Sequence, residues 1–140
     1  MTNTIIFPSG IYLIVDPCYV LHESWSEICN RLFLDLESSG DLTLTDGRRI
    51  FISNTAYGDG VYSDNIGNLY GVDSGCLGIV SWSDINQDDP KNDVTLGILH
   101  TFADDFTVTC DNGVFMFGDV VIDTAGNVDD IDDYWNFDCE

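Results

Sequence analysis

Cysteine and histidine are the residue types in this chain that would support nucleophilic catalysis. Cys18 and His22 lie four positions apart, and His100 is the second histidine. A reactive cysteine needs a nearby base, a positive charge or a helix N-terminus to lower its pKa, and none of these is evident beside Cys18. We therefore interpret Cys18 as a buried structural residue. The alternative, a small hydrolase, would need a pocket that gathers Cys18 or Asp73 with one of the histidines.

Carboxylates are far more abundant and raise the question of metal binding and acid–base catalysis. The chain has 25 Asp and Glu residues, but the EF-hand spacing is absent, and the acids in 123–133 do not fall at ligand positions. No pair of the five cysteines has the C-x-x-C spacing of a zinc site. We therefore expect no metal and no cofactor, whereas hydrolysis by paired carboxylates stays an open alternative.

The net charge of −21 is the most unusual property of the sequence, since only four basic residues oppose the acids. A soluble domain of this size needs a net charge of only roughly 2–8 in magnitude. Such a charge repels DNA, RNA and anionic membranes and attracts basic proteins. The composition therefore predicts a basic, nucleic-acid-binding protein as the partner, with no direct contact to nucleic acid or membrane. A homodimer and salt adaptation are open alternatives.

The charge is concentrated toward the C-terminus and carried by short side chains. Residues 1–83 have a net charge of −7 and residues 84–140 a net charge of −14, and 21 of the 25 acids are Asp. Asp favours turns, where a carboxylate is held rigidly enough to imitate a phosphate, although Asp is also the ordinary acid of β-rich loops. The predicted partner-binding residues are Asp88, Asp89, Asp104, Asp105, Asp129, Asp130, Asp132, Asp133, Tyr134 and Trp135.

The segment 128–140 joins acids to aromatic residues. Aromatic side chains often anchor an interface, so Tyr134 and Trp135 are candidates to fill pockets on a partner. The segment is loosely similar in composition to the acidic tails of bacterial single-stranded-DNA-binding proteins. The alternative is that its aromatic residues fold back onto the core as a final strand.

The elements that must position these residues are mostly strands. Apolar stretches at 4–7 and 11–15 flank a turn at Pro8-Ser9-Gly10, and period-two patterns run from residue 42 onward. The remaining strands are expected at 42–45, 49–52, 57–62, 69–72, 76–82, 94–102, 106–110 and 114–122. Asp111-Asn112-Gly113 is the strongest hairpin signal.

One amphipathic helix is expected at about 24–38, with Ser24 and Glu27 as a capping box. The sequence thus predicts a single α+β domain over 1–140. It should be mostly antiparallel β, with about 8–10 short strands in a bent sheet, small barrel or sandwich. The odd number of cysteines, the lack of a signal peptide and the lack of a long apolar stretch favour a reducing cytoplasm.

Three short segments together resemble an uncharacterised family of small bacterial and phage proteins. The resemblance rests on Asp16-Pro17-Cys18-Tyr19, on Gly58-Asp59-Gly60 and on the segment 70–75, which reads YGVDSG. It implies a bacterial or phage origin but no activity, and it suggests a conformational role with Gly71 and Gly75 at positive φ. By size and charge alone, the chain also resembles phage-encoded DNA mimics that inhibit host defence.

The function expected from the sequence is therefore non-enzymatic. The chain would be a phage-encoded acidic protein that binds and inhibits a basic host defence protein in the bacterial cytoplasm. An immunity-type protein that neutralises a toxin is the second hypothesis, because such a protein also caps a basic active site with acids.

Overall fold

The computed structural model describes residues 5–33 and 40–125. Eleven strands, one α-helix and four short 3-10 helices are found in these residues. The strands are β1 (Ile5–Phe7), β2 (Gly10–Val15), β3 (Asp41–Thr43), β4 (Arg49–Asn54), β5 (Gly60–Ser63), β6 (Leu69–Val72), β7 (Cys76–Ser81), β8 (Ile98–Phe102), β9 (Phe106–Asp111), β10 (Val114–Phe117) and β11 (Val120–Asp123). The helices are η1 (Pro17–Tyr19), η2 (His22–Ser24), α1 (Trp25–Phe33), η3 (Trp82–Asp84) and η4 (Val94–Leu96).

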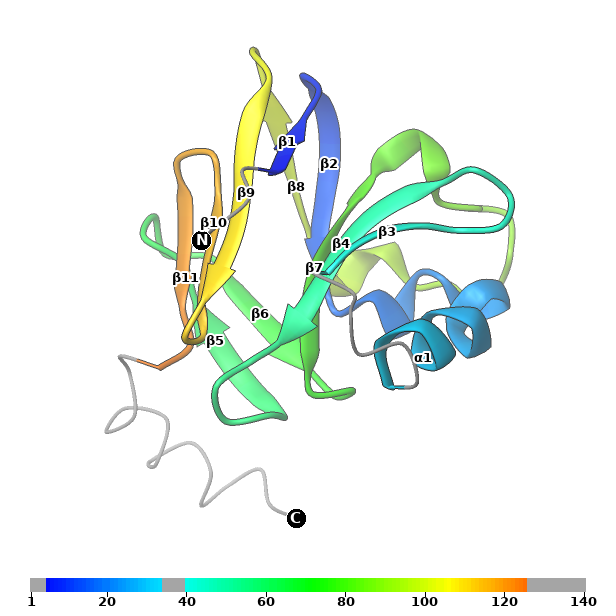
Figure 1. The fold of residues 1–140 in the computed structure, drawn as a ribbon, viewed down its shortest axis with the longest axis horizontal. Coiled ribbons are helices and arrows are strands. Elements are labelled where there is room, and N and C mark those ends of the chain that lie inside the picture. The colour runs from blue at the N-terminus through cyan, green and yellow to red at the C-terminus, as the bar shows by residue number, and fades with distance from the viewer. Residues whose placement is uncertain (1–4, 34–39, 126–140) are drawn as a thin grey trace.

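The strands form two antiparallel sheets and a separate hairpin (Figure 1). The order is β1-β9-β10-β11 in the first sheet and β3-β4-β7-β2-β8 in the second, while β5 pairs with β6 alone. The sequence therefore predicted the α+β class and the antiparallel character correctly. Among the described residues there is no closed barrel, so that alternative is wrong. The strands do not close into a barrel because β1 and β2, which flank the turn at Pro8–Gly10, belong to different sheets.

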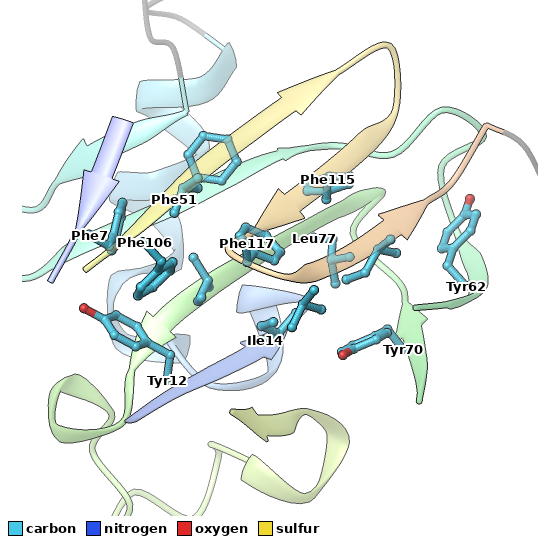
Figure 2. Close-up of a cluster of buried hydrophobic side chains, with 14 of the residues drawn as sticks. Phe7, Tyr12, Ile14, Phe51, Tyr62, Tyr70, Leu77, Phe106, Phe115 and Phe117 are labelled. Carbon is cyan, nitrogen blue, oxygen red and sulfur yellow. The ribbon is translucent and has the colours of Figure 1, made fainter. Parts of the chain in front are cut away.

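The second sheet is buried on both faces because its central strands alternate between two cores. Tyr12 and Ile14 of β2 face the first sheet, whereas Leu13 and Val15 face the helical side. Figure 2 shows the core between the sheets, where Phe115 and Phe117 of β10 lie over the second sheet. This burial explains why the sequence of β2 is apolar at nearly every position.

Helix α1 covers the opposite face of the second sheet, to the right in Figure 1. Ile28 is fully buried there and Trp25 packs at its edge. The helix begins one residue later than expected, and the expected end at 38 lies outside the described residues. Ser24 and Glu27 bind the loop between β3 and β4: Glu27 accepts from the Thr45 amide at 2.8 Å, and Ser24 accepts from Arg48.

Two predicted strands divide differently in the structure. The stretch 94–102 begins as the 3-10 helix η4, and only Ile98–Phe102 forms β8. The stretch 114–122 contains a two-residue turn at Gly118-Asp119, which separates β10 from β11. Gly118 has φ +60°, as the first central residue of a type II′ turn requires. The expected hairpin at Asn112-Gly113 is confirmed, with both residues at positive φ.

Candidate functional site

Two of the three resembling segments, 16–19 and 70–75, meet around one buried carboxylate, that of Asp16. One of its oxygens accepts from the Cys18 amide at 3.1 Å and the Ser74 hydroxyl at 2.7 Å. The other accepts from the amides of Asp73 and Ser74, each at 2.7 Å. The side chain of Tyr19 also donates to Asp73. We call this arrangement the Asp16 latch, because it fastens the loop after β2 to the loop between β6 and β7.

Asp16 is fully buried and its four hydrogen bonds join two loops far apart in the sequence, so the latch has a structural character. Gly75 in this loop has φ +82°, as expected. Gly71 is not at positive φ, because it lies within β6 opposite Val61, so that expectation is wrong. The segments 16–19 and 70–75 therefore determine how the loop after β2 is joined to the loop between β6 and β7.

Cys18 lies in the latch and is poorly suited to attack a substrate. Burial, followed by the charge of Asp16, raises the pKa of its thiol to about 12. His22 is exposed, and its backbone amide donates to Asn92 at 3.1 Å. The chemistry considered for the pair Cys18 and His22 needs a thiolate near neutral pH, which this environment opposes.

An open groove of about 740 Å³ lies where the turn between β8 and β9 meets the turn between β10 and β11. We call it the acidic groove. Its lining includes Asp104, Asp105 and Asp119, together with Phe102 and Met116. All three carboxylates are on exposed residues. Asp105 accepts from the Ser9 amide at 3.0 Å, which fixes its position over the turn between β1 and β2.

The apolar part of the groove is preorganised by aromatic packing. The rings of Phe102 and Phe106 stack with centroids 3.8 Å apart and an interplanar angle of 14°. A Cβ atom at Gly118 would lie 3.2 Å from the ring of Phe102, so the turn before β11 approaches this pair closely. The groove thus combines a rigid apolar floor with a carboxylate rim.

His100 lines the same groove and is tied to a buried hydrogen-bond chain. Its Nε2 lies 2.9 Å from the Tyr70 hydroxyl, which lies 2.7 Å from the Asp64 carboxylate. Burial lowers the pKa of His100, although the charge of Asp64 acts in the opposite direction. Burial raises the pKa of the Tyr70 hydroxyl, and the hydrogen bond from this hydroxyl to Asp64 raises it further.

The predicted site residues are thus only partly brought together. Asp104 and Asp105 share the acidic groove. Asp88 and Asp89 lie in the loop between η3 and η4, where Asp89 accepts from the Lys91 amide at 2.9 Å. The groove lining contains neither of them, and it contains neither Cys18 nor Asp73. The other predicted residues, Asp129, Asp130, Asp132, Asp133, Tyr134 and Trp135, lie outside the described residues.

Sequence reasoning missed Asp119 and the chain from Asp64 to His100. Asp119 falls inside a stretch that looks like one continuous strand, and only the Gly-Asp pair within it signals a turn. The contact between Tyr70 and His100 joins residues 30 positions apart and has no local signal.

The three arginines are used within the fold. Arg49 forms a two-pronged pair with Asp41, with both distances 2.8 Å, and its guanidinium lies 4.0 Å from the ring centroid of Phe7. Arg48 pairs with Glu23 and Asp46, and Arg31 pairs with Glu27. Since these arginines are paired elsewhere, they do not neutralise the carboxylates of the acidic groove.

Among the described residues, no cluster of three or more potential metal ligands is present, and no helix is long and apolar enough to cross a membrane. Comparison with known proteins adds no identity. No protein-family model, curated protein or solved structure matches the chain. What the acidic groove binds must therefore be inferred from its own chemistry.

Proposed function

We propose that this protein is a non-enzymatic binding protein that inhibits a basic, nucleic-acid-binding partner. The observation that carries the proposal is the acidic groove, where Asp104, Asp105 and Asp119 stand exposed around an apolar floor. A net charge of −21 surrounds this groove with a field that attracts cations. Electrostatic complementarity of this kind accelerates encounter and selects basic partners.

The wider proposal is that the partner belongs to a host defence system and that the protein is encoded by a bacteriophage. The size and the charge of the chain support this interpretation. Competition with nucleic acid follows from it directly, since carboxylates that occupy a phosphate-binding surface exclude DNA or RNA from that surface.

Two observations favour binding over hydrolysis by Cys18. The thiol has a pKa of about 12, so very little thiolate is present at neutral pH. The acidic groove, which contains His100, contains neither Cys18 nor Asp73. The groove therefore lacks the grouping of a nucleophile with a base that a cysteine hydrolase needs.

The test is capture of partners from a nuclease-treated bacterial lysate by the immobilised full-length protein. We expect basic nucleic-acid-binding proteins to be retained at low salt and released at high salt, because salt screens the attraction. Added duplex DNA should release the same proteins. Failure to retain any basic protein at low salt would contradict the proposal, and retention that DNA does not disturb would contradict competition with nucleic acid.

A further inference from the structure

The floor of the acidic groove distinguishes it from an ordinary patch of surface acids. The stacked rings of Phe102 and Phe106 and the partly exposed side chain of Met116 offer apolar contact beneath the carboxylates. A small hydrated cation gains nothing from such a floor. A cation on an aliphatic stem gains burial of the stem as well as charge attraction.

The rim of the groove is built for a ligand with several N–H donors. Asp104, Asp105 and Asp119 come from two different turns, and each ionised carboxylate offers two acceptor oxygens. The volume of about 740 Å³ falls in the usual range of ligand pockets, roughly 300–1,000 Å³. It has room for a side chain together with part of the chain that carries it.

His100 also lines the groove, and the buried chain fixes its tautomer. Burial acts to raise the pKa of Asp64, but the Tyr70 hydroxyl and the amides of Ile66 and Asn68 lower it more strongly. Asp64 is therefore ionised at neutral pH and only accepts. The single proton of the Tyr70 hydroxyl goes to Asp64, so the Tyr70 oxygen accepts from Nε2–H of His100. In the neutral ring, Nδ1 is then a hydrogen-bond acceptor.

We propose that the acidic groove binds an arginine side chain presented by the basic partner. The guanidinium would lie among Asp104, Asp105 and Asp119, and its stem would lie on Phe102 and Met116. Arginine suits this site better than lysine because its planar group donates five N–H bonds, pairs with carboxylates in two-pronged fashion and packs flat on aromatic rings. This inference rests on the proposed function and names the group that the site recognises.

Binding of labelled oligoarginine and oligolysine peptides to the full-length protein tests the inference, measured by fluorescence anisotropy at near-physiological ionic strength. The groove variant carries Asp104→Asn, Asp105→Asn and Asp119→Asn. A matched control carries Asp59→Asn, Asp93→Asn and Asp111→Asn, which removes the same charge from other exposed positions. Asparagine keeps an acceptor oxygen for the Ser9 amide at position 105.

We expect the groove variant to bind oligoarginine about tenfold more weakly than the wild type, and the control to change by about twofold. The wild type should also prefer oligoarginine over oligolysine. Equal losses in the two variants, or equal affinity for the two peptides, would overturn the arginine site and leave the proposed function standing. Absence of binding to both peptides by the wild type would contradict both proposals.

Nuclear magnetic resonance of the imidazole nitrogens provides a second readout, which reports on His100 itself and not on the net charge of the protein. The chain has only two histidines, so ¹⁵N-histidine labelling gives two rings, with exposed His22 as an internal control. We expect the Nε2–H tautomer for His100 and a shift of its Nδ1 signal when oligoarginine is added. An Nδ1–H tautomer, or a signal that the peptide does not move, would overturn the role of His100.

Discussion

The Asp16 latch and the acidic groove use the same functional group in opposite ways. In the latch, one buried carboxylate receives four hydrogen bonds from Cys18, Asp73 and Ser74. In the groove, three carboxylates stand exposed on turns, and the described residues give only Asp105 a hydrogen bond, from Ser9. The oxygens of Asp16 accept hydrogen bonds from within the fold, whereas the groove carboxylates can accept hydrogen bonds from a ligand. The number of acids in a sequence therefore says little until burial and donors are known.

The largest effect should come from breaking the latch. Asp16→Ala removes the acceptor of three backbone amides and one hydroxyl in a fully buried position. Buried donors left without partners are costly, so we expect the free energy of unfolding to fall by about 3 kcal/mol or more. Urea denaturation measures this. Asp104→Ala removes the same charge from the groove and should change stability by less than about 0.5 kcal/mol. Similar losses in the two variants would remove the distinction between latch and groove.

The second prediction concerns Asp64, a buried carboxylate that is linked to the groove residue His100 through the Tyr70 hydroxyl. Asp64→Asn turns the NH2 donor of the new side chain toward other donors, either the Tyr70 hydroxyl or the backbone amides of Ile66 and Asn68. We therefore expect the free energy of unfolding to fall by about 1–3 kcal/mol at neutral pH. The pKa of Asp64 is lowered in the folded protein, so its stabilisation is complete above the ordinary value of 3.8 and is lost as the pH falls through the folded-state pKa.

Urea denaturation of both proteins at neutral pH and near pH 3 checks this sign. The difference in stability between wild type and Asp64→Asn should shrink at the lower pH, because pH 3 lies below the ordinary pKa of 3.8, so the unfolded wild-type chain takes up a proton at Asp64 there and part of the stabilisation is lost. A difference that stays constant or grows on acidification would show that Asp64 is not held in its ionised form.

The third prediction concerns Gly118, which lies against the floor of the groove. Gly118→Ala puts a side chain at φ +60°, with its Cβ 3.2 Å from Phe102 and 3.3 Å from Phe106. We expect a loss of about 1 kcal/mol together with weaker binding of oligoarginine, since the floor must shift. Gly67→Ala is the matched control: its φ is +98°, but no atom lies within 4 Å of the added Cβ. Gly67→Ala should lose stability without losing affinity for oligoarginine. If Gly67→Ala lost as much affinity as Gly118→Ala, the loss in Gly118→Ala would not be due to the floor of the groove.

The sequence predicted the local features of this fold better than its non-local pairings. The β9–β10 hairpin followed from Asn112-Gly113, whose positive φ values are encoded by two adjacent residues. The partition of β1 and β2 into different sheets depends on distant partners, such as Val108 opposite Ile5. The same limit applies to the groove, because Asp104 and Asp105 were predicted from charge, whereas Asp119 and His100 join them only through the packing of the sheets.

The smallest expected effect is on stability when the rim of the groove is neutralised. The variant with Asp104→Asn, Asp105→Asn and Asp119→Asn should unfold with a free energy within about 0.5 kcal/mol of the wild type, and on the stable side, because like-charge repulsion is reduced. The control with Asp59→Asn, Asp93→Asn and Asp111→Asn should behave alike, and raising the salt should abolish both differences, since screening removes the same repulsion.

Urea denaturation at low and high salt provides the measurement. A marked loss of stability in the groove variant alone would mean that these carboxylates hold the two turns together, as Asp16 holds its loops. The groove would then be a second latch, and its acids would not be available to a partner. Unchanged stability with weakened binding of oligoarginine is the combination expected of a surface that serves recognition.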